Sequence, residues 1–228
     1  MLIKDWMAKN VLTVDENTSL MRATRVMKEN NIRKLPVVSH GKLVGIISDR
    51  DVKDASPSKT TSLDIHELYY LLSEMKVKDV MTNDPIIMHG TDSLEKAALI
   101  MLDNKISGIP VLDDAGQIIG LLSETDVLLG FIHATGIKDG AIQYVFNLPD
   151  APGSVTELVK VLRENNSRLI SILTSYEDAG DGMKQVAIRV TVAKNMKPDE
   201  LTKILSDKFE LVFTATDDLE QLPHKSSH

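Results

Sequence analysis

The chain has 228 residues, of which 43% are hydrophobic and 26% charged, so it can bury two or three hydrophobic cores of modest size. Its formal net charge of −7 gives it no broad basic surface for a polyanion such as DNA. The absence of cysteine excludes disulfides, thiolate metal sites and cysteine nucleophiles.

The N-terminal residues, MLIKDWMAKN, place Lys4 and Asp5 before any apolar segment can form, so we expect no secretory signal. The longest uncharged apolar stretch, VLLGFIHATGI at 127–137, is too short to span a bilayer. We therefore expect a soluble, cytoplasmic protein that binds neither a membrane nor nucleic acid.

The first 135 residues contain a duplicated pattern. Three landmarks recur 74 positions later, namely Met7 and Met81, Leu20 and Leu94, and Pro36 and Pro110. The string GIISDRD at 45–51 returns 75 positions later as GLLSETD at 120–126. The one-residue difference falls in the polar turn DDAG, which is where a duplicated structure tolerates an insertion.

Each copy predicts the element order β-α-β-β-α. An extended segment leads to a helix that begins near Ser19 or Ser93, with apolar residues at helical spacing. Two short apolar strands follow, KLPVVS and LVGIIS in the first copy and GIPVL and QIIGLLS in the second. A second helix comes after GxxSxxD. Since neither copy buries its sheet alone, we expect the copies, 1–55 and 76–135, to pack face to face around a pseudo-twofold axis.

The segment between the copies, 56–75, predicts a linker helix with an apolar seam that ends in Leu72 and Met75. We expect this helix to lie on the core of the repeats. A helix used for dimerisation is the alternative.

The stretch 140–215 changes to the order β-α-β-β-α-β, which is a ferredoxin-like arrangement. AIQYVFNL alternates as a strand, a helix follows with Ser154 and Glu157 as its capping box, and Pro198 begins a second helix. The fold class is therefore α+β. The polar residues 216–228 predict a disordered tail.

Few residues are spaced for catalysis. The six histidines are scattered, and none has a second histidine or a carboxylate at metal-ligand spacing. The sequence lacks GxxxxGK[ST], GxGxxG and GxSxG. We therefore predict no metal site, no catalytic residue and no enzymatic activity.

The repeated GxxSxxD has two interpretations. A serine followed three residues later by an acid is close to a capping box, although that motif prefers glutamate to the aspartate found here. The alternative is a nucleotide site, because a strand end that leads into a helix N-terminus favours a phosphate, and a carboxylate one turn later can accept hydrogen bonds from ribose hydroxyls. Spacing alone leaves both open.

The landmarks around the two strings resemble a tandem cystathionine β-synthase (CBS) domain pair, or Bateman module. The resemblance rests on MTNDPI at 81–86, WMAKNVLTV at 6–14, the strands LPVV and IPVL, and both GxxSxxD strings. LPDAPGSVTELVKVL, near the start of 140–215, resembles an ACT domain, and the combination resembles CBS–ACT proteins of the acetoin-utilisation (AcuB) type.

This resemblance implies a non-catalytic, allosteric sensor that binds an adenosine nucleotide such as AMP, ADP or ATP and requires no cofactor. Asp51 and Asp126 would hold ribose, and Ser48 and Ser123 would contact phosphate. The adenine slot would be lined and closed by Val11, Leu12, Ile32, Thr82, Pro85, Ile86 and Ile106.

The two copies differ in charge at these sites. Arg33, Lys34 and Arg50 of the first copy align with Ser107, Gly108 and Thr125 of the second. A phosphate chain needs such cations, so the first site is predicted to hold a multiply phosphorylated ligand and the second a less charged one, or none. Solvated charges on an edge strand are the alternative interpretation of the pair at 33–34.

In the ACT-like part, Asp150 and Gly153 keep the loop before the first helix, whereas Arg168 stands where amino-acid-binding relatives have asparagine. We therefore expect this part to form a homodimer rather than to sense amino acids. Two further classes stay open, a ligand-free structural dimerisation module and an unrecognised enzyme of acetoin catabolism. The regulated partner enzyme is unknown.

Overall fold

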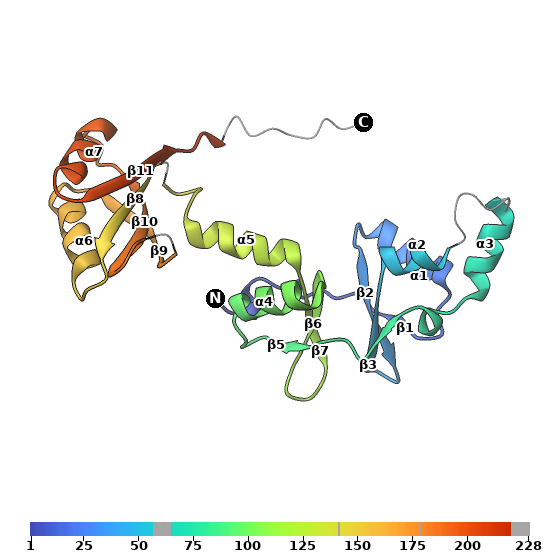
Figure 1. The fold of residues 1–228 in the computed structure, drawn as a ribbon. Coiled ribbons are helices and arrows are strands. Elements are labelled where there is room, and N and C mark those ends of the chain that lie inside the picture. The colour runs from blue at the N-terminus through green and yellow to red at the C-terminus, as the bar shows by residue number, and fades with distance from the viewer. Residues whose placement is uncertain (57–64, 141, 178, 220–228) are drawn as a thin grey trace. The chain divides into compact units, whose positions relative to one another are not determined.

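The structure is a computed structural model that describes residues 1–56, 65–140, 142–177 and 179–219 (Figure 1). The chain forms two compact units, Met1–Gly130 with two hydrophobic clusters and Phe131–His228 with one among the described residues. In the described part of the chain, no helix is long and apolar enough to cross a membrane.

The duplicated elements follow one another in matching order apart from the additional strand β4, with the helix α3 between the two copies; the last helix, α5, ends beyond Gly130. The first copy comprises η1 (Ile3–Asp5), β1 (Val14–Asp15), α1 (Leu20–Glu29), β2 (Lys34–Ser39), β3 (Lys42–Ser48) and α2 (Asp49–Ala55). After α3 (Ile65–Glu74), the second comprises η2 (Val77–Asp79), β4 (Thr82–Asn83), β5 (Met88–His89), α4 (Leu94–Asn104), β6 (Gly108–Leu112), β7 (Ile118–Ser123) and α5 (Glu124–Thr135).

The helices α1 and α4 begin at the predicted serines. Ser19 Oγ accepts the N–H of the third helical residue at 3.3 Å, and Ser93 Oγ does the same at 3.2 Å. Each helix then buries one apolar face, Leu20, Ala23 and Met27 in α1 and Leu94, Ala97 and Met101 in α4. Each face packs on the sheet of its own copy, in two separate clusters.

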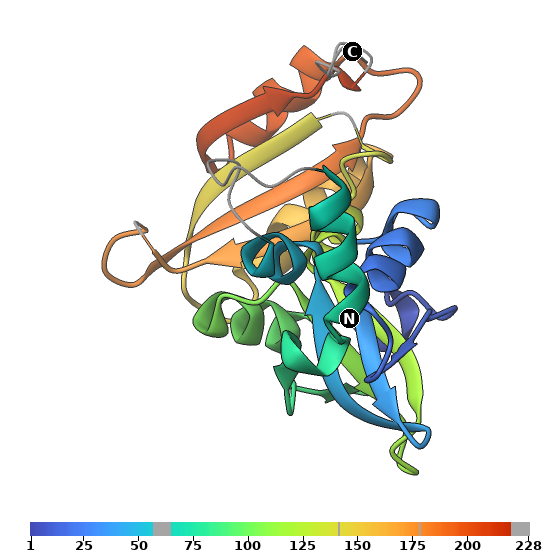
Figure 2. The same cartoon turned by 90° about the vertical axis from the view of Figure 1, so that its right-hand side faces the viewer.

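The sheets of the two copies exchange short segments. In the first copy β2 and β3 form the antiparallel hairpin drawn in blue in Figure 2, flanked by β1 and by β4 of the second copy, which places Thr82 opposite Ile46. In return, Ala8 bridges Leu121 at the outer edge of the sheet β5-β6-β7, with both backbone hydrogen bonds at 3.0 Å. Each copy thus completes its sheet with backbone from the other.

This exchange explains the glycine that opens each GxxSxxD string. A Cβ on Gly45 would lie 2.5 Å from Met81 Sδ, and one on Gly120 would lie 2.1 Å from Met7 Sδ. Each methionine therefore packs directly on the glycine of the other copy. A side chain at either position would require the methionine to move, and at Gly45 it would also lie 3.0 Å from the Thr82 carbonyl oxygen.

The helix α3 lies between the two copies, and its side chains are described from Tyr70 onward. Leu72 and Met75 pack against the cluster of the first copy, beside α1. The beginning of the predicted linker, 57–64, lies outside the described residues.

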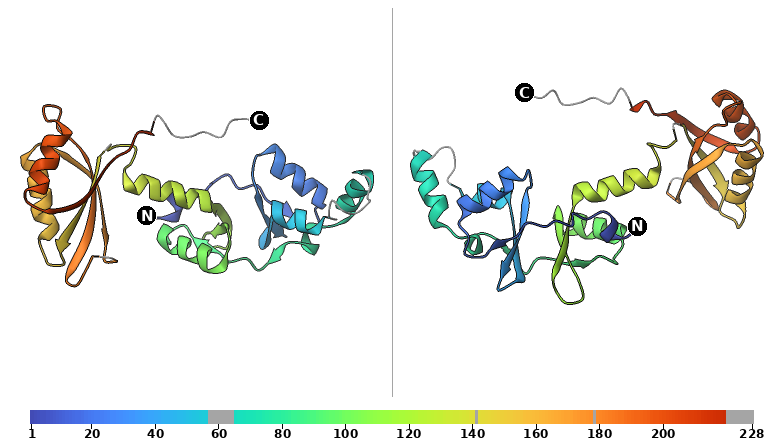
Figure 3. Two further views of the ribbon diagram at one scale, coloured as in Figure 1. Left: turned by 45° about the horizontal axis from the view of Figure 1, so that its top comes forward. Right: turned by 180° about the vertical axis from the view of Figure 1, so that it is seen from behind.

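The second unit has the predicted order β-α-β-β-α-β. Its elements are β8 (Ile142–Pro149), α6 (Ser154–Glu164), β9 (Arg168–Ser175), β10 (Met183–Thr191), α7 (Pro198–Ser206) and β11 (Glu210–Thr216). The strands pair antiparallel in the order β11-β8-β10-β9. Figure 3 shows α6 and α7 on the same face of this sheet. That face carries the alternating apolar residues of β8, Ile142, Tyr144, Phe146 and Leu148.

The predicted capping box at the start of α6 is wrong. Ser154 is the first helical residue rather than the cap, and its hydroxyl is buried without a hydrogen-bond partner among the described residues. The cap position belongs to Gly153, whose φ of +91° is a left-handed value that glycine adopts without strain. The turn geometry of the preceding loop, rather than a side chain, sets where this helix begins.

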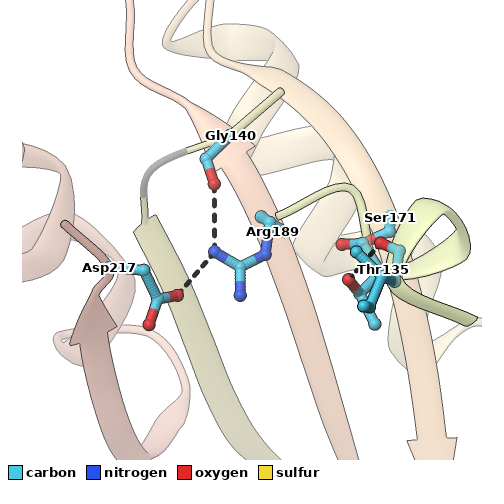
Figure 4. A network of polar contacts seen from close by, with 6 residues as sticks. Thr135, Gly140, Ser171, Arg189 and Asp217 are labelled. Carbon is cyan, nitrogen blue, oxygen red and sulfur yellow. Dashed lines mark hydrogen bonds and ion pairs between the residues drawn. The ribbon is translucent and has the colours of Figure 1, made fainter. Parts of the chain in front are cut away.

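On the other sheet face, β10 carries a buried arginine (Figure 4). Arg189 is 5% exposed, and its Nη1 donates to the Gly140 carbonyl at 3.0 Å and to Asp217 Oδ2 at 2.9 Å. On β9, Ser171 Oγ donates to the Thr135 carbonyl at 2.6 Å. These bonds attach the segment that leads into β8, and the segment that follows β11, to one sheet face. Asp217, which the sequence placed in the disordered tail, is thus held by an ion pair.

Candidate functional site

The serine and aspartate of GIISDRD cap the helix that follows them. The Ser48 backbone N–H and hydroxyl both donate to Asp51 Oδ2 at 2.7 Å, and the Asp51 N–H donates to Ser48 Oγ at 3.3 Å. These bonds form a capping box. Because Ser48 is the last residue of β3, the pair joins a strand end to a helix start.

GLLSETD builds the same arrangement. The Ser123 N–H and hydroxyl donate to Asp126 Oδ2 at 2.7 and 2.6 Å, and the Asp126 N–H donates to Ser123 Oγ at 3.2 Å. Ser123 is the last residue of β7. For reference, we give the name first cleft to the strand-to-helix junction at Ser48 and Asp51, and the name second cleft to the junction at Ser123 and Asp126.

The capping interpretation of GxxSxxD is therefore confirmed, and the argument that aspartate disfavours it is wrong. An aspartate reaches the serine N–H because the serine hydroxyl also donates to the same oxygen and draws the carboxylate close. In both clefts the bonds from described residues to the carboxylate end on Oδ2. Since a carboxylate has about four acceptor positions, the same aspartate can cap a helix and also accept from a ligand through Oδ1.

The side chain of Lys34 extends from the first copy to the second. Its backbone lies opposite Ser48 in the β2–β3 hairpin, whereas its Nζ donates to Ser107 Oγ at 2.6 Å. Burial lowers the pKa of the Lys34 ammonium. The carboxylates of Asp49 and Glu124 act in the opposite direction, which places negative charge from both copies around this ammonium.

The other predicted cations lie differently. Arg33 and Arg50 are exposed at the first cleft, and the Arg33 carbonyl accepts the Asp49 N–H at 3.0 Å. The aligned carbonyl of Ser107 accepts the Glu124 N–H at 3.2 Å in the second cleft. The strand-to-helix junctions of the two copies are thus built alike, but the three predicted cations do not converge on one point.

The residues predicted for the adenine slot come from exchanged segments. Thr82 pairs with β3 two residues before Ser48, so the structure brings it to the first copy. Pro85 and Ile86 follow β4; Ile86 is 38% exposed. Val11 and Leu12 lie between Ala8, which bridges the second copy's sheet, and β1. A slot built from these residues would therefore combine both copies.

Ile32 and Ile106 contribute to the cores. Each packs against the hydrophobic cluster of its own copy, and each backbone N–H donates to the preceding helix, to the carbonyls of Met27 and Met101. Both side chains are partly exposed, so each has one side on the core and one side free for a further contact.

A cavity of about 460 Å³ lies near the hairpin turns of both copies. It is lined by Lys42, Leu43, Asp84, Pro85, Ile87, Leu112, Ala115, Gly116 and Gln117. Only Pro85 belongs to the predicted ligand residues. The cavity therefore does not include the Ser–Asp pairs.

In the second unit, the three predicted ACT residues do not form a single cluster of bonded side chains. Asp150 is exposed and accepts from Lys184 Nζ at 3.3 Å, Gly153 caps α6, and Arg168 is an exposed residue at the start of β9. Within the described residues, no group of three or more histidines or carboxylates is placed to hold a metal ion.

Comparison with known proteins identifies the duplicated unit. Residues 3–58 and 77–132 match the model of the CBS domain. A CBS domain-containing protein of Dictyostelium discoideum is 33% identical over 128 residues, which cover 56% of this chain and 88% of that protein. The chain belongs to the CBS domain family. The two GxxSxxD clefts are therefore parts of a CBS pair.

Other curated relatives are longer. The inosine-5′-monophosphate dehydrogenase of Korarchaeum cryptofilum is 32% identical over 136 residues, which cover 60% of this chain but 25% of that enzyme. A CBS pair thus also occurs as a minor part of enzymes whose remaining sequence this match does not include.

Solved structures agree with the fold. The CBS-pair protein CBSX2 of Arabidopsis thaliana is 28% identical, with a TM-score of 0.51 over 61% of this chain and 98% of that chain. CBSX2 has also been solved in complex with AMP. An acetoin utilisation protein (AcuB) of Vibrio cholerae is 24% identical, with a TM-score of 0.50 over 61% of this chain and 96% of that chain. The AcuB likeness concerns the fold alone.

Proposed function

We propose that this protein is a non-catalytic regulator that binds an adenosine nucleotide in the clefts of its CBS pair. The observation that carries the proposal is the pair of matching Ser–Asp arrangements, each with a carboxylate oxygen available beyond the cap. Support also comes from CBSX2, a similar CBS pair that has been solved with AMP.

Each residue then has a defined role. Asp51 and Asp126 accept hydrogen bonds from the two ribose hydroxyls through Oδ1, while Oδ2 maintains the cap. Thr82, Pro85 and Ile86 line one side of an adenine slot, with Val11 and Leu12 at the other cleft. Arg33 and Arg50 face the phosphates of a nucleotide in the first cleft.

Regulation requires that the nucleotide prefer one arrangement of the two copies. The difference between its affinities for the two arrangements is the free energy that can shift a partner or the second unit. Because each sheet contains backbone from the other copy, a movement of one copy also moves a sheet edge of its neighbour. The exchanged segments are the physical connection through which a bound nucleotide would act.

Loss of the cleft aspartates is expected to weaken nucleotide binding. Each hydrogen bond to a charged group contributes about 1.5–3 kcal/mol, so removal of two ribose contacts lowers affinity by roughly 100-fold or more. Isothermal titration of AMP, ADP, ATP, NADH and S-adenosylmethionine against wild type, Asp51→Ala and Asp126→Ala measures this. If no adenosine compound binds wild type, the proposed function is wrong.

We further propose that residues 140–215 form a ferredoxin-like ACT domain that makes the protein a homodimer. Support comes from an apolar row across the sheet face that α6 and α7 leave uncovered. Register places Phe213 opposite Val145, Val145 opposite Ala187, and Ala187 opposite Leu173. Phe213 is 55% exposed and Leu173 is 45% exposed. A second copy of the same face would cover such a row in an isologous contact.

A charge in this row is expected to produce a monomer. Phe213→Asp would place a carboxylate against the apolar row of the partner, and burial of an unpaired charge destabilises an interface by several kcal/mol. Light scattering coupled to size exclusion measures the mass. The matched control is Thr156→Asp, which adds the same charge to an exposed residue of α6, on the side of the sheet opposite the apolar row. A wild-type monomer at micromolar concentration would contradict the proposal.

The link to acetoin utilisation stays a prediction that rests on the resemblance of the CBS–ACT combination. We propose that the regulated partner, if it is a separate protein, is an enzyme of that process. Comparison of acetoin turnover by a candidate enzyme with and without this protein and AMP tests the link.

A further inference from the structure

We propose that Lys34 of the first copy supplies the cation that recognises a phosphate group in the second cleft. The inference rests on the proposed function and specifies the ligand of that cleft as a phosphorylated adenosine rather than a neutral one. It assigns the phosphate selectivity of one cleft to a side chain of the other copy.

The first reason is the position of the ammonium. The Lys34 backbone lies beside the first cleft, opposite Ser48, but the side chain carries its charge to Ser107 Oγ at 2.6 Å. Ser107 is tied to the second cleft because its carbonyl accepts the N–H of Glu124, the residue directly after Ser123. The ammonium of Lys34 therefore lies at the strand-to-helix junction of the second copy.

The second reason is the space that the second copy leaves for this side chain. A Cβ on Gly108 would lie 2.7 Å from Lys34 Cδ and 3.2 Å from Lys34 Cε. Gly108 is the residue that aligns with Lys34 in the duplication, so the equivalent positions face each other. A side chain at position 108 would displace the Lys34 methylenes from their present path. Lysine in one copy and glycine in the other form a matched pair.

The third reason is charge. The second cleft has Ser107 and Thr125 where the first has Arg33 and Arg50, so its own copy supplies no cation at these positions. The Lys34 ammonium is partly desolvated, and it feels the carboxylates of Asp49 and Asp51 in the first copy and of Glu124 in the second, together with the Arg33 guanidinium. A phosphate near Ser107 would meet a cation that has already lost part of its hydration, which makes the charge-assisted bond stronger than at an exposed lysine.

The sequence alone predicted a less charged ligand, or none, for the second cleft, because the second copy has fewer cations than the first. The position of Lys34 changes this prediction. Because the lysine extends to the other copy, both clefts can recognise a phosphate, the first through exposed arginines and the second through Lys34.

The test measures AMP and adenosine binding at the second cleft alone. In an Asp51→Ala background, which removes the ribose contact of the first cleft, we expect Lys34→Met to weaken AMP binding by roughly 10- to 100-fold. Adenosine, which lacks the phosphate, should change less than about twofold. Lys28→Met, an exposed lysine at the end of α1, is the matched control and should change neither.

The reverse background makes the assignment specific. In Asp126→Ala, where only the first cleft retains its aspartate, Lys34→Met should weaken AMP binding far less. A second variant, Gly108→Ala, keeps the lysine but displaces it, and should weaken AMP binding in the Asp51→Ala background as well. Melting temperature and circular dichroism confirm that each variant is folded.

Two outcomes overturn the inference while leaving the proposed function intact. One is a Lys34→Met effect confined to the Asp126→Ala background, and the other is an equal loss for AMP and adenosine. If wild type binds neither compound, the proposed function fails, and the inference fails with it.

Discussion

Replacement of both Asp51 and Asp126 by glutamate is expected to abolish AMP binding while leaving the melting temperature within about 2 °C of wild type. The two roles of these carboxylates respond in opposite ways to one additional methylene. Glutamate is the preferred residue at the N3 position of a capping box, so the helices remain capped. The longer side chain moves the free oxygen by more than 1 Å, which is enough to lose a hydrogen bond to ribose.

This pair of substitutions separates the two interpretations of GxxSxxD more sharply than alanine does. Alanine removes the cap and the ligand contact together, so a loss of binding could follow from local unfolding. The matched control is Asp79→Glu in η2. Asp79 also accepts a capping N–H, from Lys76 at 3.0 Å, but it lies outside both clefts. Calorimetric titration of AMP and a thermal melt on the same samples give both readouts. Unchanged AMP affinity in the glutamate variant would mean that the aspartates act only as caps.

The order of the elements in the first unit was predictable because the duplication shows each sequence pattern twice. A helix starting at Ser19 is one periodic pattern among many, but the same pattern at Ser93 makes chance agreement improbable. The strand β8 was equally predictable, since apolar residues alternate along it and every second side chain faces the core that the helices cover.

The exchange of segments could not be predicted, because an apolar residue looks the same whichever sheet it packs against. Met7 belongs by sequence to the first copy, yet it packs on Gly120 of the second. One signal was present. A glycine at the same place in two otherwise apolar strands indicates a close approach by another group. It does not identify the group, which comes from a distant part of the chain.

In the candidate site too, local contacts were predictable from the sequence and contacts between distant residues were not. The Ser–Asp pairs were found because their contacts are local, three residues apart. The sequence did not predict that the Lys34 side chain reaches Ser107 of the second copy. The prediction grouped Lys34 with Arg33 and Arg50, because it assumed that residues close in sequence contact the same ligand. The alignment of Lys34 with Gly108 was the available signal, since a glycine opposite a long side chain leaves room for it.

The second prediction concerns the stability of the second unit, which depends on the ion pair between Arg189 and Asp217. Asp217→Ala is expected to destabilise this unit by about 2–3 kcal/mol, because it leaves the Arg189 guanidinium buried without its carboxylate. For a unit of this size, that is a fall in melting temperature of roughly 10 °C. Far-UV circular dichroism follows the whole chain. Fluorescence of Trp6, the only tryptophan in the chain, follows the first unit and should report an unchanged transition.

Arg189→Met should destabilise the unit by less than half as much. Loss of the arginine leaves Asp217, whose side chain is 36% exposed, free to be hydrated, and leaves one carbonyl, that of Gly140, without this donor. It also removes a buried Nε that has no hydrogen-bond partner among the described residues. The asymmetry follows from burial, since the more deeply buried partner is the one that cannot be hydrated when it is left alone.

The double variant decides whether this account is right. If Asp217 stabilises the unit by neutralising Arg189, then Asp217→Ala should have little further effect once Arg189 is methionine, and the coupling energy should approach the whole effect of the single variant. Additive effects would mean that Asp217 stabilises the end of β11 on its own. In that case the buried arginine would be held by the Gly140 carbonyl, and the segment leading into β8 would be attached to the sheet independently of the chain that follows β11.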